Sequence, residues 1–217
     1  MRKRIFLSTI FLLSIVLIGC NRNEKPKNFD YGHIDNNKYV NSYFDFEITL
    51  PDGWIVQNKD QMDKLASSGK DLITGDDPKM KAAFEASKIN TANLLSVFQF
   101  EQGSPVDFNP SFLLVAENVK YSPGIRTGSD YLFHARRLLE QSQLKYDHID
   151  KEFAKEVING TDFYKMNAEI NYGNMMITQT YYSTISKEFS FNAIITYIDD
   201  GQKKILLDAI NSMKFRR

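Results

Sequence analysis

The last third of the chain constrains the fold most, because it holds long stretches of alternating residues separated by short turn sequences. Residues 161–172 and 189–198 place apolar side chains at every second position, as strands with one buried face do, and residues 175–185 are expected to form a further strand between them. Asn159-Gly160 separates the first of these stretches from residues 153–158, and Asn-Gly is a strong signal for a two-residue hairpin. The pattern therefore predicts an antiparallel meander.

The sequence before the meander predicts helices and strands in mixed order. Phe44, Phe46, Ile48 and Leu50 alternate with polar residues, and the turn sequence at 51–53 leads into a second short apolar run, so a half-buried hairpin is expected there. Further strands are expected at residues 94–101, 112–119 and 145–150, with 112–119 central because it is nearly continuously apolar. Helices are expected at residues 59–68, from Asp77-Pro78 onward, at 128–142 and from Asp199-Asp200 onward.

The order of these elements, with the opening sequence at 43–54 (YFDFEITLPDGW) and the closing sequence at 205–215 (ILLDAINSMKF), resembles the PsbP-like superfamily. The resemblance implies an α+β fold, an α/β/α sandwich built on an antiparallel β-sheet. Members occur as photosystem II extrinsic subunits and as bacterial lipoproteins of unassigned role, so it also implies a binding or assembly module rather than an enzyme. No site residue of the family maps onto this chain.

The first residues have the form of a secretory signal. A Met-Arg-Lys-Arg start precedes an apolar run over residues 5–18, and Gly19 and Cys20 follow. Because a membrane-crossing helix needs about 20 apolar residues, this run is short for a permanent span. The sequence therefore predicts a signal peptide over residues 1–19, and its removal would leave 24 basic and 27 acidic residues, a net charge of −3.

The end of this segment, Leu17-Ile18-Gly19-Cys20, resembles the lipobox of bacterial lipoprotein signal peptides. The resemblance implies that Cys20, the only cysteine, is lipidated and becomes the mature N-terminus on the extracytoplasmic face of the cell membrane. Two acyl chains hold a protein on a membrane where one would exchange. Because Asn21 follows, the outer membrane is expected if the envelope is Gram-negative. The alternative is that Cys20 is an incidental small residue after an ordinary signal or a single-span anchor.

Two regions are expected after the signal. Residues 20–38 are polar and poor in aliphatic side chains, which predicts a lipidated flexible tether with a reach of about 60 Å at full extension. Residues 39–217 form a single domain by length, large enough for a proper core. The 27 basic and 27 acidic residues of the whole chain balance, which argues against nucleic acid as a partner.

The sequence offers no assembled set of catalytic, cofactor-binding or metal-ligating residues. His33 falls in the expected tether, His134 lies beside Asp130 on the polar face of a helix, and His148 sits on a short strand. The adjacent acids at 76–77 and 199–200 precede helices, where capping explains them. We therefore predict no enzyme activity, no cofactor and no metal, with Cys20 as the only assigned site.

Three function classes remain. The first is a membrane-tethered module that docks a ligand or an envelope protein on a polar sheet face, although a plainly solvated or helix-covered face is the simpler interpretation. The second is a carrier of a small apolar ligand, suggested only by the 16 Phe and 11 Tyr residues. The third is a hydrolase with a dispersed site. The polar face of the first class comprises Lys165, Asn167, Glu169, Asn171, Thr178, Thr180 and Tyr182.

Overall fold

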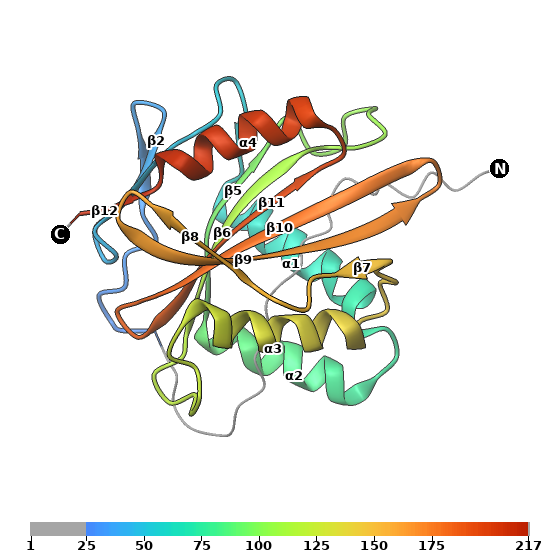
Figure 1. The fold of residues 1–217 in the computed structure, drawn as a ribbon, viewed down its shortest axis with the longest axis horizontal. Coiled ribbons are helices and arrows are strands. Elements are labelled where there is room, and N and C mark those ends of the chain that lie inside the picture. The colour runs from blue at the N-terminus through green and yellow to red at the C-terminus, as the bar shows by residue number, and fades with distance from the viewer. Residues whose placement is uncertain (1–24, 217) are drawn as a thin grey trace.

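The computed structural model describes residues 25–216, and an eight-stranded antiparallel sheet forms its middle layer (Figure 1). The strand order is β4-β5-β6-β11-β10-β9-β7, and β8 also pairs with β9. The strands are β4 (Ile55–Val56), β5 (Thr91–Phe98), β6 (Ser111–Asn118), β7 (His148–Ile149), β8 (Ala154–Ile158), β9 (Thr161–Tyr172), β10 (Met175–Ser186) and β11 (Phe189–Tyr197).

The predicted meander is confirmed in strands β8 to β11. Asn159 and Gly160 both have positive φ, as do Lys187 and Glu188 at the turn between β10 and β11. Positive φ at both central residues is what a tight hairpin turn requires. Strand β6 lies in the interior of the sheet and every one of its residues is buried, which confirms the expectation from its continuous apolar sequence.

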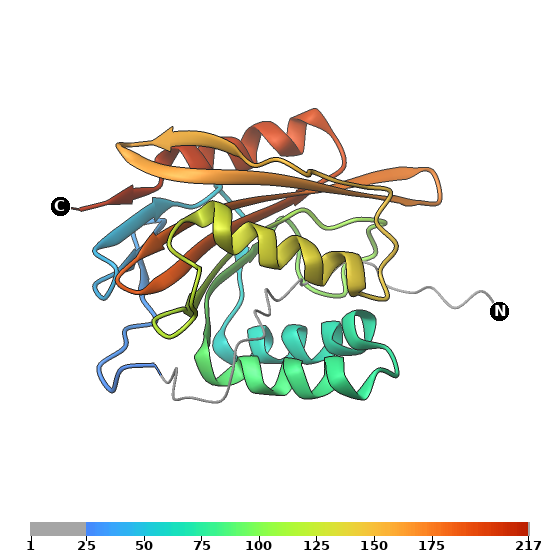
Figure 2. The same cartoon turned by 60° about the horizontal axis from the view of Figure 1, so that its bottom comes forward.

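Three helices cover one face of this sheet: α1 (Lys59–Thr74), α2 (Pro78–Asn90) and α3 (Gly128–Gln141) (Figure 2). Asp77 caps α2, since its side chain accepts hydrogen bonds from the Lys79 and Met80 backbone N–H groups. Helix α1 extends six residues beyond the predicted end at residue 68. The predicted start of α2 and the predicted extent of α3 are confirmed within one residue.

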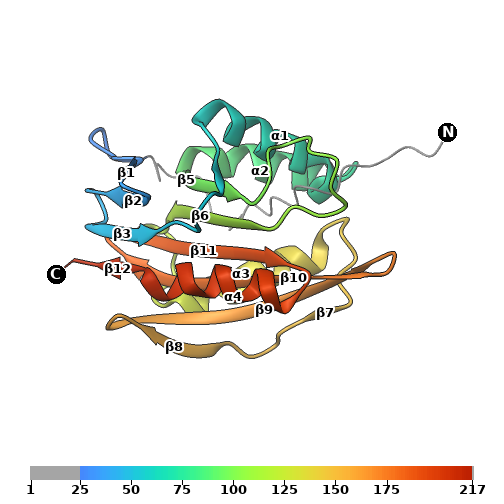
Figure 3. The same ribbon diagram turned by 90° about the horizontal axis from the view of Figure 1, so that it is seen from above.

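The opposite face carries helix α4 (Asp200–Ser212) and a second, four-stranded sheet of order β1-β2-β3-β12 (Figure 3). Its strands are β1 (His33–Asp35), β2 (Lys38–Asn41), β3 (Phe46–Thr49) and β12 (Lys214–Phe215). The fold is therefore α+β, with an antiparallel sheet between helical layers as predicted, and the small sheet adds to the layer that holds α4.

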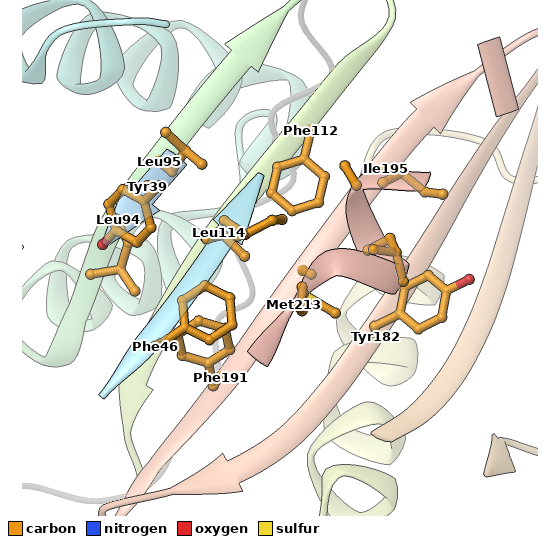
Figure 4. Packing of buried hydrophobic residues seen from close by; sticks show 14 of the residues in the cluster. Tyr39, Phe46, Leu94, Leu95, Phe112, Leu114, Tyr182, Phe191, Ile195 and Met213 are labelled. Atoms are coloured by element: carbon orange, nitrogen blue, oxygen red, sulfur yellow. The ribbon is translucent and has the colours of Figure 1, made fainter. Parts of the chain in front are cut away.

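Aromatic side chains fill the space between the two sheets. Phe46 from β3 and Phe191 from β11 lie with ring centroids 4.6 Å apart, and Met213 closes the cluster beside α4 (Figure 4). Tyr182 sits at the edge of this cluster, with its hydroxyl directed away from the apolar side chains. Aromatic residues bury large apolar areas, so this cluster fixes the small sheet onto the large one.

The hairpin predicted for residues 44–56 is wrong. Phe46–Thr49 pairs with β2 and β12 in the small sheet, whereas Ile55–Val56 pairs with β5 in the large sheet. The turn at 51–53 thus carries the chain from one sheet to the other. Alternation correctly identified which side chains are buried, but the apolar face of β3 finds its partners in β11 rather than in the next strand.

The segment from residue 25 to 38 also differs from the expected tether. Phe29 packs its ring against Tyr43, Phe44 and Phe189, at centroid distances of 4.8 to 5.8 Å. His33–Asp35 forms β1, and the positive φ of the two asparagines at 36–37 turns the chain into β2. The folded body therefore includes Lys25 and the residues that follow it. Cys20 and the predicted signal lie outside the described residues.

Candidate functional site

A groove of about 550 Å³ runs between α4 and strands β8, β9 and β10. Figure 3 shows α4 over β10 and β11, with β9 and β8 extending beyond it. Strand residues form the floor, and Lys203, Leu207 and Asn211 of α4 form one wall. Of the polar sheet face that the sequence predicts, six side chains line this groove: Lys165, Asn167, Glu169, Thr178, Thr180 and Tyr182.

Strand register places these side chains together. Asn167 on β9 lies opposite Thr180 on β10, which lies opposite Ile195 on β11. Since opposite residues in an antiparallel pair point to the same face, this row runs across the groove floor. Lys165 and Tyr182 form the next row in the same way.

Hydrogen bonds fix the side chains in the middle of the groove floor. The Thr180 hydroxyl donates to Asn167 Oδ1 at 2.8 Å and lies 3.3 Å from the Tyr197 hydroxyl. The Asn167 amide donates in turn to Asp150 Oδ2 at 2.9 Å. The positions of Asn167 and Thr180 are therefore fixed before any ligand binds, which lowers the ordering cost of binding.

Charged side chains of both signs border the groove. Lys165 forms an ion pair with Glu156 of β8, and the Lys203 ammonium lies 5.7 Å from the centre of the Tyr197 ring. Asp199 caps α4 by accepting a hydrogen bond from the Gln202 backbone N–H at 2.8 Å. Because the lining carries both cations and carboxylates, the groove suits a ligand that both donates and accepts hydrogen bonds.

Tyr182 supplies a hydroxyl group to the groove. Burial raises the pKa of this phenol, and the nearby Glu156 carboxylate and Tyr197 raise it further. The hydroxyl is therefore protonated at neutral pH and can donate a hydrogen bond. Among the described residues it has no hydrogen-bond partner, so this donor is free for a bound molecule.

The seventh predicted residue, Asn171, does not line the groove. It is exposed near the end of the β9–β10 hairpin, and its backbone N–H donates to Asp147 Oδ2 at 2.6 Å. Sequence reasoning missed Glu156, Tyr197 and the wall residues of α4. The alternation over residues 189–198 places Tyr197 in the apolar row, and no sequence pattern indicates where α4 leaves the sheet uncovered.

The three histidines lie far apart in the fold. His33 is exposed on β1, His134 is on α3, and His148 Nε2 lies 3.0 Å from Asp150 Oδ1. Asp130 lies beside His134 on α3 as predicted, and its carboxylate accepts the Thr127 and Arg126 backbone N–H groups at the start of that helix. Among the side chains that the structure describes, those of residues 25–70 and 73–216, no three acidic, histidine or cysteine groups gather so as to hold a metal ion.

No helix in the described part of the chain is both long and apolar enough to cross a membrane. The predicted lipidation site, Cys20, lies outside that part. Its assignment stays a prediction from the sequence.

Comparison with known proteins identifies no family for the chain. No family model matches, and no curated protein matches. The resemblance to the PsbP-like superfamily therefore stays a prediction from the order of elements.

Solved structures do match, at low similarity. One from Bacteroides thetaiotaomicron is 12% identical with a TM-score of 0.45, covering 85% of this chain and 50% of its own. LpqN of Mycobacterium tuberculosis, described as involved in cell envelope biogenesis, is 12% identical with a TM-score of 0.40, covering 77% of this chain and 78% of its own. The chain thus spans half of the Bacteroides structure, and neither similarity assigns it a function.

Proposed function

We propose that the chain is a lipoprotein anchored through Cys20 on the extracytoplasmic side of a cell membrane, and that it acts as a non-catalytic binding or assembly module. In a Gram-negative envelope the outer membrane is the expected site, because Asn21 follows the cysteine. The groove beside α4 is the proposed binding site for a polar ligand or for a segment of an envelope protein.

The observation that carries this proposal is the overlap between prediction and geometry. The sequence alone predicts the polar face, and six of its seven residues line one groove. Helix α4 covers part of the sheet face, so Thr180 and Tyr182 are buried, whereas the other four side chains are partly exposed. If this sheet face served only to pack α4, apolar residues would be expected under the helix along the whole length of α4.

The lining supports a polar partner over a small apolar one. Asn167, Thr180 and Tyr182 offer donors and acceptors, and Lys165 and Glu169 add charge. A carrier of an apolar ligand would instead need an enclosed apolar cavity. The buried Phe and Tyr side chains that suggested a carrier contact one another between the two sheets.

The anchor is tested on the full chain isolated from membranes. Intact mass measurement should show loss of residues 1–19 and addition of a lipid on Cys20. The Cys20→Ser variant should lack the lipid and leave the membrane fraction. An unaltered chain that carries no lipid, or a variant that stays in the membrane unprocessed, would contradict the anchor.

The groove is tested by site-specific photocrosslinking in intact cells. A benzophenone amino acid replaces Met176, which lines the groove and is 46% exposed, or Ile205, which is 40% exposed on α4 outside the groove. A discrete adduct is expected from position 176 only. Thr178→Trp, which fills the groove floor, should abolish that adduct while leaving the thermal unfolding midpoint nearly unchanged.

Equal adducts from both positions, or an adduct that survives Thr178→Trp, would show that the contact does not depend on the groove. No adduct at position 176 under conditions where the chain is anchored and folded would contradict groove binding.

A further inference from the structure

Lys25 attaches the start of the described chain to the end of helix α2. Its ammonium group donates hydrogen bonds to three backbone carbonyls, of Lys88 at 3.3 Å, Ile89 at 3.1 Å and Thr91 at 2.9 Å. The last carbonyls of a helix have no partners within the helix, and a cation there also interacts favourably with the helix dipole. Lys25 therefore acts as a cap for α2.

The burial of Lys25 supports this role. The side chain is partly buried, and this burial, followed by the nearby Lys59 ammonium, lowers the pKa of Lys25. Three carbonyl acceptors compensate for that burial. These hydrogen bonds thus fix the position of the chain at Lys25 relative to the end of α2.

Because the folded body begins at Lys25, the chain that joins it to the predicted anchor at Cys20 is shorter than the sequence alone predicts. Only residues 21–24 separate Cys20 from Lys25, and a chain of that length spans at most about 18 Å between the two Cα atoms. The tether expected from the sequence alone allowed about 60 Å. If Cys20 is lipidated, the end of α2 must therefore lie close to the lipid headgroups.

The surface at this end of α2 fits a lipid headgroup layer. Ile89 is 59% exposed and Tyr31 is 41% exposed, and both are large apolar or amphipathic side chains. Lys59 and Lys88 lie beside Lys25 and Tyr31 around a hollow of about 410 Å³. Lysine and tyrosine side chains keep an apolar stem in the interface while their polar ends reach water or headgroups.

Charges near this surface are partly compensated. Lys59 pairs with Asp63 at 2.7 Å, and Lys88 pairs with Glu85 at 3.1 Å. Both pairs are exposed, and such pairs contribute little in water, so the ammonium groups can exchange partners with anionic headgroups. Lys27, exposed and two residues beyond Lys25, adds a further cation.

We propose that this α2-end surface, formed by Lys25, Lys27, Tyr31, Lys59, Lys88 and Ile89, rests on the anionic headgroups of the membrane that holds the anchor. The proposal rests on the lipid anchor of the proposed function. Helices α1 and α2 lie on the opposite side of the large sheet from α4 (Figures 2 and 3). The groove therefore lies across the large sheet from the helical layer that carries this surface.

The test uses the full acylated chain in vesicles of phosphatidylcholine and phosphatidylglycerol. Ile89→Cys and the matched Ile205→Cys on α4 each receive an environment-sensitive fluorophore, since the lipid occupies the thiol of Cys20. Lipids with a nitroxide on the headgroup then quench the label by proximity. Several-fold stronger quenching is expected at position 89 than at position 205, and equal quenching would overturn the proposal.

A second variant tests the cap itself. Lys25→Met keeps the stem but removes the three hydrogen bonds, so the difference between positions 89 and 205 should shrink. An unchanged difference would overturn the assignment of Lys25 as the attachment point. Intact mass and flotation with vesicles report the anchor separately: an acylated, floating chain with equal quenching contradicts only the orientation, whereas a chain without lipid contradicts the anchor.

Discussion

The two faces of the large sheet are covered in different ways. On one face, helices α1, α2 and α3 pack along the sheet, and their apolar side chains form one continuous cluster with strands β6, β9, β10 and β11. On the other face, the small sheet buries an aromatic cluster at one end, and α4 covers only part of the rest, so a polar groove stays open. Both faces are thus closely packed, and on the second face a polar groove also stays open beside α4.

Gly128 shows how closely helix α3 packs on the backbone of the large sheet. A Cβ atom at Gly128, the first residue of α3, would lie 2.0 Å from the Ser183 carbonyl oxygen of β10. On the groove face, a Cβ at Gly201 of α4 would lie 3.2 Å from the nearest atom, Asp199 Oδ1. The difference teaches that α3 is fixed directly on the sheet backbone, whereas the nearest neighbour of Gly201 is a side-chain atom that can shift by a few tenths of an ångström.

The largest effect is expected from Gly128→Ala. The new methyl group must push α3 away from β10, because a backbone carbonyl cannot rotate aside, and overpacking of this kind costs about 3 kcal/mol of unfolding free energy. Urea unfolding of the purified domain measures the loss. Gly201→Ala on α4 is the matched control and should change stability by less than about 1 kcal/mol. Equal losses for the two variants would remove the contrast between the faces.

A smaller, pH-dependent effect is expected from Asp130→Asn at the start of α3. Burial raises the pKa of Asp130, but hydrogen bonds from Thr127 and Arg126 outweigh it, and the net pKa is lowered. A lowered folded-state pKa contributes stability above the unfolded value of about 3.9, and this contribution is lost as the pH falls. The variant should therefore lose about 1 kcal/mol at pH 7.

Unfolding of the two proteins at neutral and acidic pH checks this expectation. The difference between them should be present at pH 7 and vanish near pH 2. A difference that stays constant across that range would show that the Asp130 charge is not what stabilises the cap.

The smallest effect is expected in the groove. Thr178 lines its floor without a hydrogen bond among the described residues, and Thr178→Val keeps the shape and the preference for strand structure. The unfolding free energy should change by less than about 0.5 kcal/mol, while the crosslinked adduct at position 176 should weaken. A loss of more than about 2 kcal/mol would show that this face also carries the packing of the fold.

Local sequence patterns predicted the elements whose partners are close in the chain. Two-residue turns at 159–160 and 187–188 set the register of neighbouring strands, and the Asp77-Pro78 pair marked the start of α2. Each of these depends on a few adjacent residues, so a single sequence suffices.

Contacts between distant segments could not be predicted in this way. Strand β3 pairs with β12 across more than 160 residues, and β1 lies in a stretch too polar to show a strand pattern. For the site, alternation placed six polar side chains on one face, but the wall of the groove depends on how α4 packs. The cap formed by Lys25 could not be predicted, because nothing in the sequence distinguishes a lysine in a polar stretch from one that is fully solvated.

The contacts of Lys25 and Phe29 have a mechanical consequence. A pulling force on the N-terminal end of the described chain reaches the Lys25 hydrogen bonds first and the Phe29 ring next, before it loads β1 and the small sheet. These contacts can break one after another and release a short length of chain. The segment before β1 can therefore extend before the rest of the domain bears the force, so small displacements of its N-terminal end do not reach the eight-stranded sheet.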